Sequence, residues 1–235
     1  MMSRQRSDDV GIPRRRNSKV DQAHPVYELD MWLVDSQPLV WRSLAAPADF
    51  TLADLHDLIQ IVMEWDEEHM HHFQTKDGRL FEPGASEYVN PFAEIFAELG
   101  VESRRPKDEA AVTLRDVFDE LKNKFVYEYD FGDSWLHGIK LIQTHADASA
   151  FAHLPICLAG AMAGPPEDCG GVWGYTEKLE ILRNPDSNED WHQEMIEWFG
   201  DDFDPRVFDI AAKNHRIAAA WGKRTPKPSN RKRRH

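Results

Sequence analysis

Several short segments alternate apolar and polar residues, which is the pattern of a strand with one buried face. The clearest is VYELDMWLV, in which Tyr27, Leu29 and Met31 alternate with Glu28 and Asp30. The segment PLVWRSLAA follows the turn DSQP and predicts a second strand, so the pair forms a hairpin. Two more hairpins are predicted, because HMHHFQT and RLFEP flank an Asp-Gly turn, and FVYEYDF and SWLHGIKLIQT flank a Gly-Asp turn.

Other segments repeat apolar residues at helical spacing. The strongest is TLADLHDLIQIVMEW, where Thr51 is a good N-cap, Asp54 follows three residues later, and leucines and isoleucines form one stripe. Further helices are predicted at 90–100, 112–121, 173–182, 189–200 and 204–221. Because hairpins interleave with helices, and strand-helix-strand units are absent, we expect an α+β fold. It consists of a mainly antiparallel sheet with helices packed on it.

Charge divides the chain into three parts. Its formal net charge is -13, but 25–221 holds 15 Lys or Arg against 38 Asp or Glu. We therefore expect a disordered basic arm at 1–24, one compact domain at 25–221, and a basic tail at 222–235. Such an acidic domain repels phosphate, so contact with nucleic acid is expected only through the tails. The residues for that contact are Arg14, Arg15, Arg16, Arg231, Lys232, Arg233 and Arg234.

Membrane and secretory signals are absent from the sequence. No run of about 18 apolar residues occurs, and no apolar stretch follows the Arg-rich start. The two cysteines could form one disulfide, but nothing in the sequence places the protein outside the cytosol, where such bonds rarely persist. A cytoplasmic protein without membrane contact is expected.

Four motifs occur in one order along the chain. The first joins the PLVWR strand and the LADLH helix to WDEEHMHHF; the others are YEYDFGDSWLH, CLAGAMAGPPEDCGG and FDPRVFD. Together they cover about residues 25 to 216, and they resemble the plasmid pRiA4b ORF-3-like family. The resemblance implies an α+β domain carried on plasmids and mobile elements, where some members are insertion-sequence passenger proteins named TnpR. It implies no particular reaction.

The chain departs from this family pattern at one position. Relatives often carry a third cysteine just before the Pro-Pro pair, where this sequence has Gly164. A metal site that required three thiolates from this loop is therefore incomplete here.

The loop between Cys157 and Cys169 is the first candidate for chemistry. Eleven residues separate the two cysteines, so the spacing is that of neither a zinc ribbon nor a thioredoxin-type pair. A zinc site would need further ligands such as His137 or a histidine of HMHH. The alternative is a structural loop, in which prolines stiffen a turn, Gly170 and Gly171 allow positive φ, and the acids Glu167 and Asp168 cap a helix or bond loop amides. The structural alternative is favoured.

The histidine-rich segment EWDEEHMHHF is the second candidate. In an extended strand, His69 and His71 would share a face, and with Asp66 they could hold one Zn, Mn or Fe ion. The same histidines could instead be half-buried strand residues bonded to acids.

The segment YDFGDSWLH is the third candidate. Asp130 and Asp133 flank the turn and could share an ion or divide acid and base roles, with His137 four residues further on. The plainer interpretation, which is favoured, is that Gly132 supplies the φ of the turn, Asp caps it, and Trp135 packs on the sheet.

Two functions follow from these candidates. Phosphate loops, dinucleotide fingerprints, GxSxG and HExxH are all absent, and no serine lies in a recognisable recombinase setting. The leading hypothesis is a non-enzymatic accessory or interaction protein of a plasmid or mobile-element system, with a protein partner or with nucleic acid on its tails. The alternative is a metal-dependent, hydrolase-like enzyme that requires Zn, Mn or Fe. In such an enzyme, three of the motifs would line one cleft. The residues expected in that cleft are His69, His71, Asp130, Asp133, Trp135, His137, Glu167 and Asp168.

Overall fold

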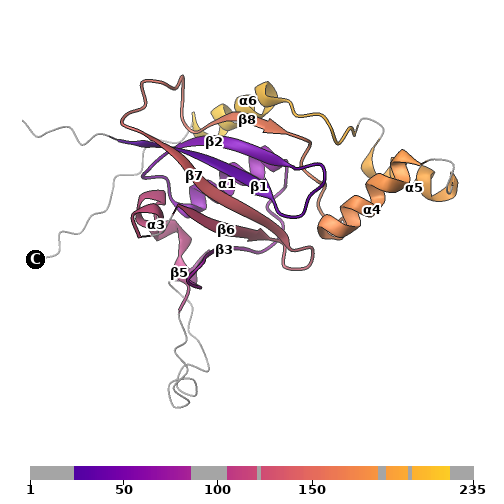
Figure 1. The fold of residues 1–235 in the computed structure, drawn as a ribbon, viewed down its shortest axis with the longest axis horizontal. Helices are drawn as coiled ribbons and strands as arrows, with labels where there is room; N and C mark the ends of the chain where they lie inside the picture. The colour runs from indigo at the N-terminus through magenta and orange to yellow at the C-terminus, as the bar shows by residue number, and fades with distance from the viewer. Residues whose placement is uncertain (1–23, 86–104, 121–122, 185–188, 201–202, 223–235) are drawn as a thin grey trace, which may run out of the picture.

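An eight-stranded sheet forms the body of the protein (Figure 1). The computed structural model describes residues 24–85, 105–120, 123–184, 189–200 and 203–222. Its strands are β1 (Val26–Leu33), β2 (Trp41–Pro47), β3 (His71–Thr75), β4 (Leu80–Glu82), β5 (Lys107–Asp108), β6 (Lys124–Tyr129), β7 (Trp135–His145) and β8 (Ile156–Ala161). They lie in the order β5-β4-β3-β6-β7-β1-β2-β8, and every pair is antiparallel except β4 and β5. The predicted α+β class, with its mainly antiparallel sheet, is confirmed.

Helices cover one face of this sheet. The described helices are α1 (Leu52–Met63), η2 (Glu109–Ala111), α3 (Leu114–Glu120), α4 (Gly171–Arg183), α5 (Glu189–Phe199) and α6 (Ile210–Trp221). Helix α1 lies across the strands with α6 close to it, whereas α4 and α5 project beyond the end of the sheet (Figure 1). The alternating residues of β1 face α1 and are buried, with Leu29 paired to Leu44 on one side and to Leu141 on the other.

Helix α1 is fixed at both ends by side chains. Thr51 and Asp54 form the predicted capping box at its start. At its end, the buried guanidinium of Arg42 donates from Nε to the carbonyl oxygen of Val62, 3.2 Å away. Burial lowers the pKa of Arg42 to about 10, so the group is still charged at neutral pH. The charge therefore lies at the negative end of the helix dipole, where it stabilises α1.

Strand β8 was not predicted. It occupies the first part of the cysteine-containing segment, which the sequence indicated to be a loop throughout. Its outer edge is covered by α6, because the amide of Asn214 bonds both the N–H and the carbonyl oxygen of Cys157, at 2.8 and 2.9 Å. The free edge of the sheet is thereby closed to further strand pairing.

Three local expectations need correction. The residues with positive φ in the β6–β7 turn are Asp130 and Ser134, and Gly132 is not among them. The last helix begins at Ile210 rather than near residue 204, since Asp209 caps it by accepting from the backbone N–H of Ala212. The acids Glu167 and Asp168 do not cap α4, whose N-cap is Gly170 and has no side-chain bond, but Glu167 does bond a loop amide, that of Asp66, as the other expectation had it.

Some expectations lie outside the described residues. They are the helix at 90–100 and nearly all of the basic arm and tail, including the arginines and lysine expected to contact nucleic acid. Within the described ranges, no helix is both long and apolar enough to cross a membrane.

Candidate functional site

Three loops meet beside the ends of β3, β6 and β8, and we name this place the loop junction. It is formed by 64–70, 130–134 and 162–170. The indole of Trp65 donates to the carbonyl oxygen of Pro165 at 2.8 Å, and the backbone N–H of Asp66 donates to Glu167 at 2.9 Å. The hydroxyl of the buried Tyr129 also donates to Glu167. Three of the sequence motifs therefore converge in space.

Two glycines allow this close approach. A Cβ on Gly164 would lie 2.0 Å from the carbonyl oxygen of Met63, and one on Gly171 would lie 2.2 Å from that of Asp133. Gly171 also has φ +66°, in the left-handed region that favours glycine. Gly170 has φ +84°, and its N–H donates to the Asp133 carboxylate at 3.0 Å. The prediction that Gly170 and Gly171 have positive φ is confirmed.

His69 lies between two carboxylates at the loop junction. Its Nδ1 is 3.7 Å from Oδ2 of Asp130, and its Nε2 is 3.4 Å from Oδ1 of Asp168. The ring stands edge-on to Tyr129, 5.7 Å between centroids. Nε2 is buried and, among the described residues, has no hydrogen-bond partner, because Asp168 is near but poorly aligned. One ligand atom from each of the three residues lies within 4.8 Å of the others.

The two oxygens of Asp130 have different roles. Oδ1 accepts from the backbone N–H of Gly132 at 2.9 Å, which is the turn chemistry expected from the sequence. Oδ2 faces His69. The turn therefore fixes the carboxylate in place and directs its second oxygen toward the imidazole.

The donor set at His69, Asp130 and Asp168 fits a divalent ion. One imidazole and two carboxylates are ligands that Zn, Mn and Fe accept. The side chain of Asp168 is 75% exposed, so water can reach the remaining coordination positions.

The other predicted ligands of the histidine segment are not at this place. Strand β3 begins at His71, whose ring turns into the core and contacts Glu109, with Nε2 3.0 Å from Oε2. Glu67, with φ 61°, interrupts extended backbone before His69, so His69 and His71 do not share the face of one strand. Asp66 joins the junction through its backbone N–H and belongs to neither cluster of potential metal ligands among the described residues.

His137 and Trp135 lie in the core. Nδ1 of His137 is 3.1 Å from the carbonyl oxygen of Trp135, and the fully buried imidazole has its pKa lowered to about 3 by desolvation. Trp135 packs against Trp65 with ring centroids 5.9 Å apart, so it supports the junction from within the core. Asp133 is engaged with Gly170.

Both cysteines are buried free thiols. Burial raises the pKa of Cys157 to about 11 and that of Cys169 to about 12. Neither belongs to a cluster of potential metal ligands among the described residues. Protonated thiols are poor ligands and poor nucleophiles, which supports the structural interpretation of this segment.

A buried polar network on α1 was missed by the sequence reasoning. The rings of His56 and His71 stack with centroids 3.6 Å apart, and Nδ1 of His56 lies 2.8 Å from the hydroxyl of Tyr127. Gln60 donates from Nε2 to the same hydroxyl at 3.1 Å, and its Oε1 accepts from the backbone of Glu67. The available signal was the spacing of His56 and Gln60, four residues apart beside the apolar stripe.

Burial keeps His56 neutral. The hydroxyl of Tyr127 accepts from Gln60 and shares a second hydrogen bond with Nδ1 of His56, whose donor depends on the tautomer of the ring. Desolvation, with His71 as a smaller cause, lowers the pKa of His56 to about 3, so the ring is neutral at neutral pH.

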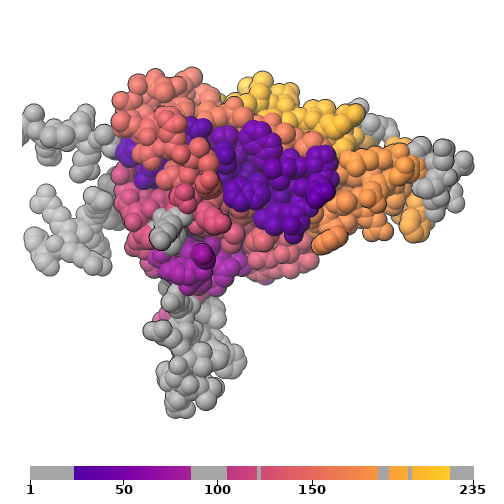
Figure 2. Space-filling model, viewed as in Figure 1, coloured from indigo at the N-terminus to yellow at the C-terminus, as the bar shows by residue number. Residues whose placement is uncertain are grey.

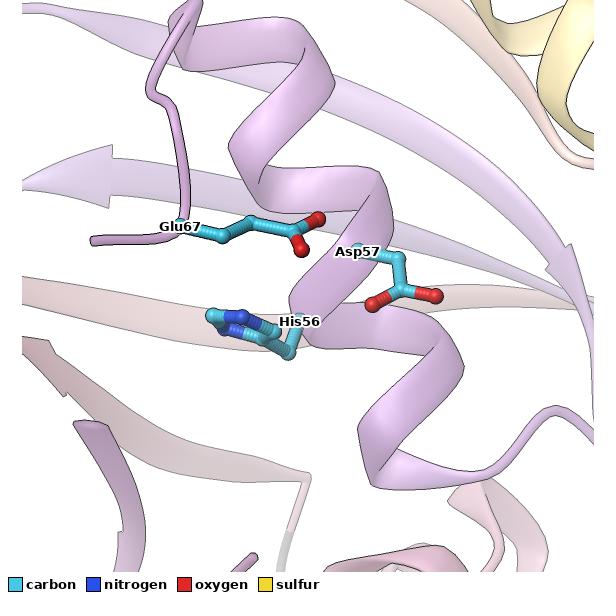
Figure 3. A group of neighbouring side chains, drawn as sticks. All are labelled: His56, Asp57 and Glu67. Atoms are coloured by element: carbon cyan, nitrogen blue, oxygen red, sulfur yellow. The ribbon is translucent and has the colours of Figure 1, made fainter. Parts of the chain in front are cut away.

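A second cluster of potential ligands surrounds this ring. His56 and Asp57 extend from α1 while Glu67 reaches in from the following loop (Figure 3), and one ligand atom of each lies within 4.8 Å of the others. Nδ1 of His56 is already hydrogen-bonded to the hydroxyl of Tyr127 at 2.8 Å, so an ion could use only Nε2. His56 is also buried whereas His69 is half-buried, so the cluster at His69 is the more accessible candidate.

Comparisons with known proteins agree with the fold and the motifs. The family model of the plasmid pRiA4b ORF-3-like proteins matches residues 25–212. The uncharacterized protein y4hQ of Sinorhizobium fredii is 30% identical over 203 residues, which are 85% of this chain and 95% of that protein. The crystal structure of MM3350, a protein of unknown function from Methanosarcina mazei, is similar with a TM-score of 0.67 and 32% identity, covering 80% of this chain and 96% of that one. The chain belongs to the plasmid pRiA4b ORF-3-like family.

Proposed function

We propose that this protein binds one divalent metal ion between His69, Asp130 and Asp168, and that it is a metal-dependent hydrolase. The observation that carries the proposal is the position of His69 between carboxylates from two other loops, with a buried Nε2 that has no hydrogen bond among the described residues. A buried polar nitrogen without a partner is costly, and an ion would supply that partner.

The surroundings support a site that exchanges ligand with solvent. Asp130 is held by its turn, and Tyr129 orients the imidazole, whereas Asp168 lies at the exposed side. Three protein ligands with open positions are typical of catalytic rather than structural sites. A metal bound there would act as a Lewis acid and lower the pKa of a bound water toward neutrality.

Calorimetric titration of the untagged, chelator-treated protein with Mn²⁺ and Zn²⁺ tests the binding. We expect about one equivalent, with His69→Ala and Asp168→Asn each weakening affinity at least about tenfold because a ligand is lost. His72→Ala is the matched control, since this neighbouring histidine faces Glu128 at 3.4 Å and is outside the cluster. Absent binding, or equal binding by His69→Ala, contradicts the proposal.

The hydrolytic role needs its own measurement. The metal-loaded protein is assayed with nitrophenyl esters and phosphodiesters. We expect turnover that disappears in His69→Ala and persists in His72→Ala. Stoichiometric metal without turnover on either class would contradict the hydrolase role while leaving the metal site in place.

The accessory role in a plasmid or mobile element is a second proposal. Exposed tryptophans on α4 and α5 favour an interaction surface, and the basic segments 1–24 and 222–235 would supply any contact with nucleic acid. Binding of DNA would then weaken with added salt and with each arginine removed. DNA binding that survives deletion of both segments would contradict the role of the tails.

A further inference from the structure

We infer that the exposed faces of α4 and α5 form a docking surface for a Lys- and Arg-rich peptide, and that the basic segment 223–235 of a second copy of the chain is its occupant. This inference rests on the proposed interaction role and is independent of the proposed metal site. An experiment can therefore contradict either proposal without contradicting the other.

The docking surface consists of tryptophan and glutamate. On α4, Trp173, Glu177 and Glu180 are exposed at spacings of four and three residues, which places them on one face of the helix. On α5, three exposed residues are also spaced three and four apart and so share one face of the helix: Trp191, Glu194 and Trp198. We name these six residues the α4–α5 surface. In Figure 2 the two helices, coloured orange, stand out beyond the rest of the described body.

The exposure of the tryptophans is unusual for a side chain of this size. Trp173 is 84% exposed, Trp191 is 55% exposed and Trp198 is 40% exposed. Exposed clusters of large apolar side chains mark interaction sites in soluble proteins. Tryptophan in particular is enriched among residues that carry binding energy.

The accompanying charges define the partner. Glutamates repel acidic partners and nucleic acid, and they pair with Lys and Arg. Tryptophan rings bind the same cations through their faces. The structure contains one such contact at this place, because Nζ of Lys178 lies 5.4 Å from the ring centroid of Trp198. The α4–α5 surface is therefore complementary to a flexible cationic peptide.

The chain carries a peptide of this chemistry immediately after α6. Residues 223–235 include seven Lys or Arg and no Asp or Glu. Four of these cations stand next to one another in the sequence RKRR at 231–234, just before His235, and Pro226 and Pro228 disfavour helix. Charge complementarity thus selects this segment over the acidic remainder of the chain.

The segment and the α4–α5 surface lie at opposite ends of the body. In its own copy, the segment follows Trp221, whose ring lies 5.6 Å from Phe50 beside the start of α1. Helix α4 starts at the loop junction, where Gly164 touches Met63 at the end of α1. The 12 residues of α1 separate these places by about 18 Å, so the segment leaves the body at the end opposite to α4, which suits a head-to-tail contact between two copies. Because 13 extended residues span about 45 Å, donation within one copy is distinguished by the sedimentation and mixing experiments below.

Sedimentation velocity of the full chain, over a range of concentrations and at low and high salt, tests the inference. We expect association at about 50 mM salt and dissociation at about 500 mM, since exposed ion pairs are screened. Trp173→Ala with Glu177→Lys should abolish association, and so should Arg231→Glu with Arg233→Glu. Ile142→Ala is the control, because it removes an exposed apolar side chain near the His145 end of β7, which is the other end of the sheet.

Mixing the two variants makes the test specific. The surface variant retains a native basic segment and the segment variant retains a native α4–α5 surface, so the mixture should associate although neither variant does alone. If the protein is a monomer at every concentration in low salt, the inference is wrong. This outcome includes the case in which the segment binds the α4–α5 surface of its own copy. Association that Trp173→Ala with Glu177→Lys leaves intact overturns it as well. His69→Ala should associate normally, which separates this result from the metal proposal.

Discussion

The indole Nε1 of Trp65 donates to the carbonyl oxygen of Pro165, 100 residues later in the chain and 2.8 Å away. The same indole stacks on Tyr129 with centroids 4.8 Å apart. Trp65 therefore connects the loop that carries His69 to the loop that carries Asp168, with the strand end before Asp130 beneath it. The candidate site depends on this connection, because its three side chains come from three loops.

Replacing Trp65 with Phe tests this connection. The aromatic packing is largely kept, but the buried carbonyl of Pro165 loses its donor. We expect the free energy of unfolding to fall by about 1–3 kcal/mol. We also expect divalent metal affinity to fall without loss of stoichiometry. Urea unfolding and calorimetry measure the two effects. Trp198→Phe, on the exposed face of α5, should change neither.

Adjacent glycines offer a matched pair of substitutions. Alanine at Gly170 would be strained only by its positive φ, because the nearest atom to the added Cβ would be 3.5 Å away. Alanine at Gly171 would have the same kind of strain, and its Cβ would also collide with the backbone of Asp133. We expect Gly170→Ala to cost about 1–2 kcal/mol of stability. Gly171→Ala should cost clearly more, and thermal unfolding of both variants measures the difference. Equal losses would mean that the loops can separate freely and that the junction is not close packed.

The sequence predicted the framework better than the site, for physical reasons. Alternation in β1 and the capping box of Thr51 are local features, and both predictions are confirmed. Strand β8 has small residues without clear alternation, and it depends on Asn214, 57 residues away, to cover its edge. No local pattern could have predicted it.

The site itself shows the limit of periodicity. The expectation that His69 and His71 share a face assumed that extended backbone includes both. The strand begins at His71, so His71 contacts Glu109 in the core whereas His69 faces Asp130 at the loop junction. Convergence of the three motifs was expected as a hypothesis, and the structure brings His69, Asp130 and Asp168 together from them.

Acid should destabilise the fold through two histidines before it protonates most carboxylates. Burial lowers the pKa of His56 and His137 to about 3, against about 6.5 in an unfolded chain. Between about pH 6.5 and 3 the unfolded state therefore binds protons at these two histidines and the native state does not. Stability is complete above about pH 6.5 and is lost as pH falls toward 3, by up to about 1.4 kcal/mol per pH unit for each histidine.

Urea unfolding between about pH 6.5 and 5 measures this slope. His137→Phe should remove roughly half of it, whereas substitution of the exposed His153 by Gln should leave it unchanged. A slope that His137→Phe does not alter would show that His137 already binds a proton in the native state.

Thiol reactivity provides an independent check on the cysteine segment. With their pKa raised to about 11 and about 12, Cys157 and Cys169 are protonated and buried at pH 8. We expect negligible reaction with a disulfide reagent in the native protein and release of two equivalents on unfolding. Rapid labelling of either cysteine in the native state would reverse the assignment of a structural role.

The most direct test of the metal site is a crystal grown with Mn²⁺ or Zn²⁺ and measured at the absorption edge of that metal. The account predicts one anomalous peak about 2.0–2.2 Å from a nitrogen of His69 and from oxygens of Asp130 and Asp168. It also predicts loss of the peak in His69→Ala. Density that shows the imidazole contacting the two carboxylates, with no anomalous peak at saturating metal, would contradict it and would identify the group as an ion pair.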